Sequence, residues 1–185
     1  MALPWGAPLT RDDLAAMPDD GHRYEIVDGA LLVTPSPGSR HQAAITELIV
    51  LLHGAAKSGL VVVPAPFDYI VTANTVLQPD LLVANRADVR ERGLEQGTPL
   101  LVVEVLSPST RLSDLGTKRL AYQAAGVPAY WVVDPEEPSL TVFLLEAGTY
   151  AETATVTGET SFHADFPFAI DVTPDRLIPS ASKPR

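Results

Sequence analysis

Two acidic residues stand where the surrounding sequence predicts buried strands. Glu104 interrupts an apolar run over 100–106, a pattern typical of a strand covered on both faces of its sheet. Asp80 follows a proline directly before a second apolar strand. A buried ionised carboxylate is costly unless a cation or hydrogen-bond donors compensate its charge. If the two strands are neighbours, both carboxylates lie at one sheet edge, where a carboxylate pair suits a hard cation such as Mg²⁺.

Each of these residues also has a purely structural explanation. Glu104 could form an ion pair with a Lys or Arg of the following helix, and a Pro-Asp pair before a strand is common turn chemistry. Lys118 shares a helical stripe with Asp114 and Tyr122 at spacing four. If that helix packs behind the Glu104 strand, Lys118 reaches the carboxylates. Otherwise it forms an ordinary surface pair with Asp114, which contributes little to stability.

Glu25 and His41 are weaker candidates when taken alone. Glu25 lies in a predicted hairpin strand, where half-exposed glutamates are common. His41 lies at the open N-terminal end of a predicted helix, where a histidine is usually structural but can also meet phosphate or water. The chain has no cysteine and four scattered histidines, which argues against a zinc site. It also lacks the common glycine-rich nucleotide motifs and the GxSxG hydrolase motif.

The elements that must position these residues follow from apolar spacing and turn residues. Asp28-Gly29 predicts a tight hairpin turn between strands at 23–27 and 30–34. We expect helices over 10–16, 39–57 and 113–125; strands over 60–63, 67–72, 81–84, 100–106, 129–134, 140–145 and 149–155; and a loop or frayed helix over 85–98. This order predicts an α/β fold with one central mixed β-sheet flanked by helices and an N-terminal hairpin. We expect one domain over 1–185, with its core at about 10–155 and a peripheral extension at about 156–185.

Composition narrows the class of protein further. The 185 residues are 46% hydrophobic, which excludes a disordered chain, and carry a net charge of −10. No apolar run reaches the roughly 18–20 residues of a membrane span. The N-terminal residues lack the pattern of a secretory signal, and the absence of cysteine is compatible with a reducing compartment, so we expect a cytoplasmic protein with no membrane partner.

The acidic charge is unevenly distributed along the chain. Residues 81–127 sum to +1, whereas residues 128–175 carry nine acidic side chains and no Lys or Arg. The overall acidity argues against a protein whose whole surface binds nucleic acid. Any anionic partner should therefore meet the middle of the chain rather than its C-terminal third.

Six segments of the chain, in order, resemble the Uma-type family of bacterial restriction endonucleases, which is grouped with the PD-(D/E)XK nuclease superfamily. The likeness spans about residues 10–155. The segments are Arg-Tyr-Glu-Ile-Val-Asp-Gly (23–29), Pro-Ser-Pro-Gly-Ser-Arg-His (35–41), Gln-Pro-Asp (78–80), Val-Val-Glu-Val-Leu-Ser-Pro-Ser-Thr (102–110), Asp-Leu-Gly-Thr-Lys-Arg-Leu-Ala-Tyr (114–122) and Gly-Val-Pro-Ala-Tyr-Trp-Val-Val-Asp (126–134).

The resemblance implies a restriction-endonuclease-like core and Mg²⁺- or Mn²⁺-dependent cleavage of DNA phosphodiester bonds. Asp80 and Glu104 match the two acids of the motif, which would hold the metal together with the backbone carbonyl of Val105. Glu25 resembles the additional acid that completes the coordination shell, either directly or through a water molecule. Because cleavage of a duplex needs two sites, we expect a homodimer.

One position departs from the superfamily pattern. The lysine expected two residues after the second acid is Leu106 here, and Lys118 on the following helix is its natural substitute. His41, Arg111 and Tyr122 are candidates for contacts to phosphate around the site.

Two further hypotheses remain open. The −10 charge and the missing lysine at position 106 are compatible with a catalytically inactive binding or regulatory module on the same fold. The same carboxylates could also serve a metal-dependent hydrolase of other phosphate esters.

Overall fold

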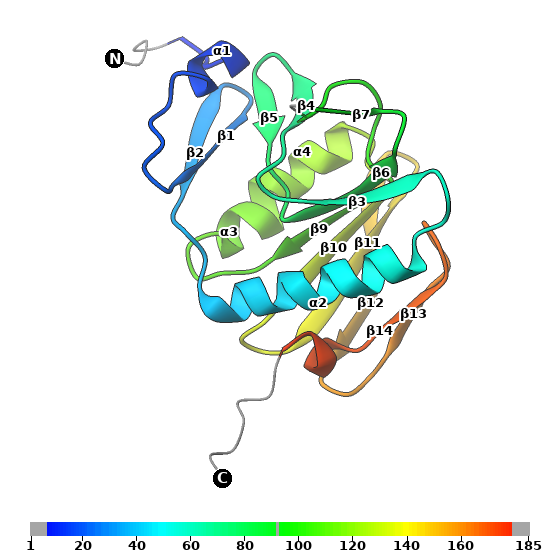
Figure 1. Cartoon of the computed structure of the whole chain (residues 1–185). Coiled ribbons are helices and arrows are strands. Elements are labelled where there is room, and N and C mark those ends of the chain that lie inside the picture. The colour runs from blue at the N-terminus through cyan, green and yellow to red at the C-terminus, as the bar shows by residue number, and fades with distance from the viewer. Residues whose placement is uncertain (1–6, 92, 179–185) are drawn as a thin grey trace.

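The computed structural model describes residues 7–91 and 93–178 (Figure 1). Its elements in chain order are α1 (Arg11–Leu14), β1 (Arg23–Val27), β2 (Ala30–Thr34), α2 (Ser39–Ala55), β3 (Leu60–Pro64), β4 (Tyr69–Thr72), β5 (Thr75–Leu77), β6 (Leu81–Asn85), β7 (Val89–Arg90), β8 (Gly93–Leu94), β9 (Leu101–Val105), α3 (Arg111–Ser113), the π-helical turn η1 (Asp114–Lys118), α4 (Arg119–Ala124), β10 (Ala129–Asp134), β11 (Ser139–Glu146), β12 (Thr149–Thr157), β13 (Phe162–Ala164), β14 (Ile170–Val172) and the 3₁₀ turn η2 (Pro174–Leu177). In this part of the chain, no helix combines the length and the apolar character needed to cross a membrane.

The central sheet has the strand order β12-β11-β10-β9-β6-β3. Strands β9 and β10 are parallel, and all other neighbours in this sheet are antiparallel, so the sheet is mixed as predicted. Strands β6, β9 and β10 are buried along nearly their whole length. Both faces of the sheet are therefore covered, in agreement with the apolar runs in the sequence.

The side chains of these central strands alternate between two hydrophobic layers. One layer packs against α2, which contributes Ala44, Leu48 and Leu52. The other packs against Tyr122 of α4 and against residues of a second sheet, including Leu77. Figure 1 shows α2 crossing one face of the sheet and α4 lying on the opposite side. The functional candidates on α2 and on η1 therefore approach the sheet from different faces.

The second sheet differs from the prediction of a single sheet with an added hairpin. Its order is β2-β1-β5-β4-β8-β7, so the N-terminal hairpin pairs with β5 and is extended by four further strands. Two of them, β7 and β8, lie in the 85–98 segment, which was expected to be a loop or frayed helix. Leu94 of β8 is fully buried in the layer beneath this sheet, which explains why a polar segment adopts strand pairing.

The hairpin turn between β1 and β2 has the predicted conformation. Asp28 and Gly29 both have positive φ, at 49° and 79°, as a primed two-residue turn requires. A side chain at Gly29 would also collide with the N-terminal segment, because an added Cβ would lie 2.4 Å from Cβ of Pro8. This close approach ties the N-terminal segment to the hairpin that carries Glu25.

The helix predicted over 113–125 is interrupted. It consists of α3, the wider i→i+5 turn η1, and α4, and it ends before Gly126, whose φ is +76°. A π-helical turn is rare and is frequently found at functional sites. Here it carries Asp114 and Lys118, both buried.

The C-terminal segment packs into the core rather than lying at the periphery. The β13–β14 hairpin and η2 place Phe168, Val172 and Leu177 in the same hydrophobic layer as α2. Charged residues between these apolar positions hide the burial pattern in the sequence. Residues 179–185, the end of the expected peripheral extension, lie outside the described part of the chain.

We predict that Leu177→Ala destabilises the protein by about 2–5 kcal/mol, because Leu177 is 0% exposed and its removal leaves a cavity. Leu112→Ala is the matched control, since Leu112 is 90% exposed, and it should leave the free energy of unfolding within about 0.5 kcal/mol. Denaturant unfolding measures both variants. Equal, small effects would show that the C-terminal segment is not part of the folding core.

Candidate functional site

Strand register brings Asp80 and Glu104 together. In the antiparallel pair β6–β9, Leu81 faces Val103 and Leu82 faces Val102, so the next position sets Asp80 opposite Glu104. The backbone N–H of Asp80 donates to Glu104 Oε2 at 3.4 Å, and the backbone N–H of Val105 donates to Asp80 Oδ2 at 2.8 Å. The two acids therefore share one end of the central sheet, as expected from the sequence.

Lys118 lies at the centre of a carboxylate cluster. Its Nζ is 2.5 Å from Glu104 Oε1, 3.2 Å from Glu25 Oε1 and 3.6 Å from Asp114 Oδ1. The Lys118 side chain is only 3% exposed and that of Asp114 only 2%, so the alternative of a surface pair between them is wrong. Glu104 does form an ion pair with the following helix, through Lys118, as its structural explanation requires. This ion pair lies within the predicted metal site.

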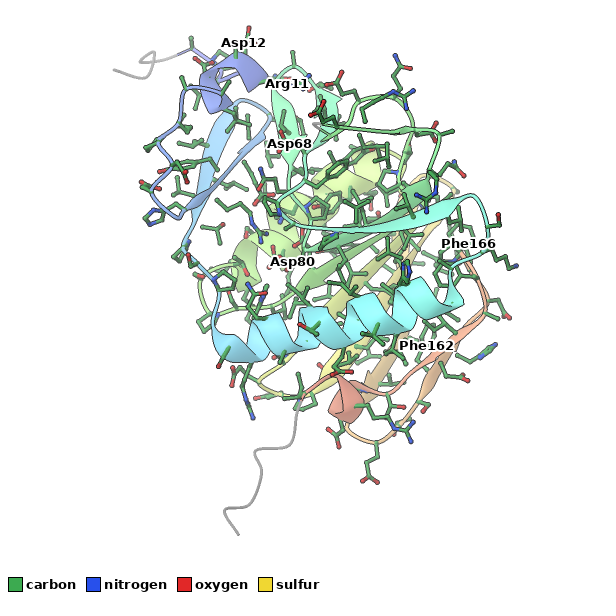
Figure 2. The ribbon with its side chains drawn as sticks, in the orientation of Figure 1. Arg11, Asp12, Asp68, Asp80, Phe162 and Phe166 are labelled. Atoms are coloured by element: carbon green, nitrogen blue, oxygen red, sulfur yellow. The ribbon has the colours of Figure 1, made fainter. Side chains whose placement is uncertain are left out.

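Asp80 is held by partners from two other elements. Arg23 of β1 donates to Oδ1 at 2.9 Å, and His41 in the first turn of α2 contacts Oδ2 at 3.1 Å. Because a carboxylate only accepts, Nε2 of His41 must carry the hydrogen. Nδ1 of the same ring is buried and has no hydrogen-bond partner among the described residues. Figure 2 labels Asp80 beside the N-terminal end of α2, in agreement with its contact to His41.

The remaining contacts orient Glu25 and Glu104. Glu25 Oε1 accepts the backbone N–H of Gln78 at 2.8 Å, which links β1 to the segment before Asp80. Glu104 Oε1 accepts the hydroxyl of the fully buried Tyr122 at 2.7 Å. Burial raises the pKa of Tyr122 well above its ordinary value, and the nearby Glu104 carboxylate adds to this, so the hydroxyl remains a donor.

The cluster contains more negative than positive charge. Four buried carboxylates face the two cationic side chains Arg23 and Lys118. Those carboxylates belong to Glu25, Asp80, Glu104 and Asp114. When these four acids and two cationic groups are all ionised, their charges sum to about −2, which a low-dielectric interior tolerates poorly.

The pKa directions follow from this imbalance. Burial raises the pKa of Glu104, and the charges of Asp114, Asp80 and Glu25 add to it, against the opposing effect of Lys118. Burial likewise raises the pKa of Asp114. Both groups therefore favour either a proton or an additional cation.

Asp80 and Lys118 shift toward their charged forms instead. Burial opposes ionisation of Asp80, but the hydrogen bond from His41 and the charge of Arg23 outweigh it and lower its pKa. Burial also opposes the charge of Lys118, but Glu104 and Glu25 outweigh it and raise the pKa of its amine. At neutral pH, Asp80 is an anion and Lys118 a cation.

The donor set fits a hard divalent cation. Mg²⁺ and Mn²⁺ prefer carboxylate and carbonyl oxygens, and the cluster offers four carboxylates with a deficit of positive charge. A cavity of about 10 Å³, roughly the space of one water molecule, lies against Asp80, Glu104, Asp114 and Lys118. Within residues 7–91 and 93–178, no three His, Asp or Glu side chains are already arranged to hold a metal ion. The Lys118 ammonium lies among the acids instead.

The predicted substrate contacts occupy different environments. His41 touches Asp80 directly. Arg111 lies at the exposed rim, where its side chain is 50% exposed and its guanidinium pairs with Asp134 at 2.6 Å. Tyr122 is buried beneath Glu104, so its contact is to the acid rather than to the surface. Leu106, at the position of the expected lysine, is buried in the core.

Sequence reasoning did not assign Arg23 and Asp114 to the site. Arg23 precedes Glu25 by two positions on β1, so the alternation of a strand places both on one face, a signal that was available. The spacing of the sequence places Asp114 on one helical face with Lys118 and Tyr122. Its burial, however, depends on the packing of η1 against the sheet, which no local sequence pattern indicates.

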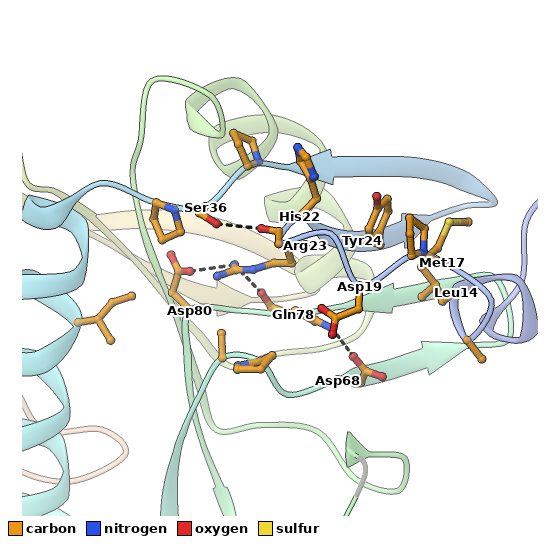
Figure 3. A pocket seen from close by; sticks show the side chains of 18 of the residues that line it. Leu14, Met17, Asp19, His22, Arg23, Tyr24, Ser36, Asp68, Gln78 and Asp80 are labelled. Atoms are coloured by element: carbon orange, nitrogen blue, oxygen red, sulfur yellow. Dashed lines mark hydrogen bonds and ion pairs between the residues drawn. The ribbon is translucent and has the colours of Figure 1, made fainter.

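A larger pocket of about 640 Å³ adjoins the cluster, and Asp80 and Arg23 are part of its wall. Figure 3 shows the side chains that line it, including His22, Tyr24 and Asp68. Its volume lies in the range of small-molecule and cofactor pockets. Asp80 therefore joins the acid cluster to a cavity that can admit part of a larger substrate.

Comparison with known proteins places the chain in a family. The model of the Uma2 family, described as "Putative restriction endonuclease", matches residues 11–173. The chain belongs to the Uma2 family. Among solved structures, it is similar to one described as a "putative nuclease belonging to DUF820" from Anabaena variabilis, with a TM-score of 0.74 and 19% sequence identity over 92% of this chain and 97% of that one. No curated protein matches the chain.

These matches establish the fold class predicted from the sequence. This Uma2 protein has a mixed α/β architecture of the restriction-endonuclease-like type.

We predict that Tyr122→Phe lowers the free energy of unfolding by about 1.5–3 kcal/mol, because it removes a buried donor from a charged oxygen. Tyr24→Phe is the matched control: its hydroxyl donates to Asp20 at 2.8 Å, but both groups are exposed, and we expect no measurable change. Thermal or denaturant unfolding in EDTA measures the pair. Equal effects would mean that the Tyr122–Glu104 contact is not the buried interaction described here.

Proposed function

We propose that this Uma2 protein is a Mg²⁺-dependent endonuclease that hydrolyses DNA phosphodiester bonds through a PD-(D/E)XK-type site. One observation carries the proposal: Asp80 and Glu104 are cross-strand neighbours in a buried, net negative cluster that also contains an amine. Membership of the Uma2 family supports the reaction class. The residues that would hold the cation are Asp80, Glu104 and Glu25, with the backbone carbonyl of Val105.

The proposed chemistry follows from these groups. A bound divalent cation would offset the negative charge of the phosphodiester and lower the pKa of a water molecule. Lys118 would orient that water and stabilise the developing charge on phosphorus oxygens through its ammonium. Arg23 and His41 keep Asp80 ionised and correctly oriented, because both donate to its carboxylate. Tyr122 fixes the orientation of Glu104.

Arginine side chains at the rim supply candidate phosphate contacts. Arg111 pairs with Asp134, and Arg40 in the first turn of α2 pairs with Glu136 at 2.9 Å. Both arginine side chains are about half exposed, and each guanidinium has more N–H donors than its one ion pair uses, so a phosphate can be bound there. Both acids belong to the end of β10 and the turn after it, in the strongly acidic C-terminal third of the chain.

A second candidate function is an inactive nuclease-fold module that binds a partner. The observation in its favour is that Lys118 already neutralises Glu104 at 2.5 Å while Leu106 fills the usual lysine position with an apolar side chain. On this account the cluster is a structural ion pair. The two functions differ in whether a cation binds and whether DNA is cut.

We predict that isothermal titration calorimetry detects Mg²⁺ and Mn²⁺ binding to the wild-type protein and that Asp80→Ala and Glu104→Ala each abolish it. Asp68→Asn is the matched control, because Asp68 lines the adjoining pocket but does not contact Lys118, and it should bind the cation as the wild type does. The alanine variants should remain folded by circular dichroism. Unchanged binding in both of them would rule out this site.

For activity, we predict that the wild-type protein converts supercoiled plasmid to nicked or linear DNA with Mg²⁺ or Mn²⁺ and that EDTA stops the reaction. A small organic phosphodiester is tested in parallel, because its hydrolysis without plasmid cleavage would indicate a hydrolase of other phosphate esters rather than a DNA nuclease. Metal binding without cleavage of either substrate would favour the inactive module.

We also propose a homodimer, since double-strand cleavage needs two sites. Light scattering of the purified protein measures its mass.

A further inference from the structure

We propose that Lys118 changes partner when the cation binds, and that Asp114 is the positioning residue that then holds its amine. This inference rests on the proposed function, because it takes the cation to bind at Asp80, Glu104 and Glu25. In the structure the Lys118 amine lies closest to the carboxylates of Glu104 and Glu25. In the cation-bound state it would form its ion pair with Asp114.

The three carboxylates around Lys118 are not equivalent. Its Nζ is closest to Glu104, at 2.5 Å, and farthest from Asp114, at 3.6 Å. Glu104 and Glu25 are the two of these acids that the proposed cation also needs. A divalent cation and an ammonium group repel each other, and repulsion between close charges is strong in a buried site. This repulsion favours a position of the amine farther from these oxygens once the cation shares them.

Asp114 has the capacity to accept the displaced amine. Its side chain is 2% exposed, and neither of its carboxylate oxygens accepts a hydrogen bond from the described residues, although Oδ1 already lies 3.6 Å from Lys118 Nζ, just beyond hydrogen-bond distance. A buried polar atom without a partner costs free energy and calls for an explanation in each native structure where it occurs. A second state of the site, in which Lys118 donates to these oxygens, supplies that explanation.

The backbone of Asp114 is already fixed, so the exchange needs no refolding. The Tyr130 hydroxyl donates to the Asp114 carbonyl at 2.8 Å, and the Asp114 N–H donates to the carbonyl of Thr110 at 2.9 Å. Lys118 lies four residues later on the same helical stretch, at the spacing that lets the two side chains meet. Rotation about the side-chain bonds of Lys118 is sufficient to move its amine toward Asp114.

Two opposite effects on cation affinity follow. Because the amine competes with the cation for Glu104 and Glu25, removing it should strengthen binding. Because Asp114 withdraws the amine from those acids, removing its charge should weaken binding. If Asp114 acts only through Lys118, the second effect must disappear when the amine is absent.

A double-mutant cycle measured by titration calorimetry with Mn²⁺ alone, without DNA, tests this. We expect Lys118→Met to bind Mn²⁺ on the order of tenfold more tightly than the wild type, and Asp114→Asn about threefold or more weakly. The double variant should bind Mn²⁺ with the same affinity as Lys118→Met alone. The matched controls are Lys57→Met and Asp165→Asn, both at exposed positions, which should leave the affinity unchanged.

Three results would overturn the inference. Unchanged or weaker binding by Lys118→Met would show that the amine does not compete with the cation. If Asp114→Asn weakens Mn²⁺ binding equally in the presence and in the absence of the Lys118 amine, Asp114 is a direct ligand instead. Failure of every variant to bind Mn²⁺ would contradict both this inference and the proposed function, whereas the expected pattern without DNA cleavage would refute the function alone.

A spectroscopic measurement covers the case in which Lys118→Met does not fold. The chain has three lysines, so isotope labelling can resolve the Lys118 amine by NMR. We expect Mg²⁺ to shift the Lys118 amine signal in the wild type, and Asp114→Asn to change the shift of the Mg²⁺-bound form more than that of the metal-free form. A Lys118 signal that is unaffected by Mg²⁺ would contradict the exchange.

Discussion

An excess of buried negative charge at one end of the central sheet is the constraint on which the site depends. Register makes the carboxylates of Asp80 and Glu104 neighbours, and Glu25 and Asp114 bring two more acids into the same volume. The positive groups of Arg23 and Lys118 offset only part of this charge. Since an unpaired buried charge is strongly destabilising, the acids must take up a proton or a cation.

The other members of the cluster come from different parts of the chain. The second sheet carries Arg23 and Glu25 on β1, and the first turn of α2 carries His41. The π-helical turn η1 then brings Lys118 and Asp114 against the face of β9 that carries Glu104. Loss of any one of these contacts leaves a neighbouring carboxylate less well compensated, so the elements depend on one another energetically.

Sequence reasoning recovered the parts of this arrangement that have local signatures. Continuous apolar runs identified β6 and β9, and a charged residue inside one of them singled out Glu104. The Asp-Gly turn identified the hairpin that carries Glu25. The extension of that hairpin into a six-stranded sheet was missed, because β7 and β8 are two residues each and are stabilised by burial of Leu94 rather than by local propensity. The burial of Asp114 and the packing of Phe168 likewise arise from long-range contacts.

The central claim is that these acids form a single cation site. Anomalous diffraction from a crystal soaked in Mn²⁺ tests it most directly, because it locates the ion independently of activity. The account predicts one strong peak within coordination distance of carboxylate oxygens from both Asp80 and Glu104. Peaks confined to surface carboxylates, or none at saturating Mn²⁺, would contradict it and leave the cluster as a structural ion-pair network.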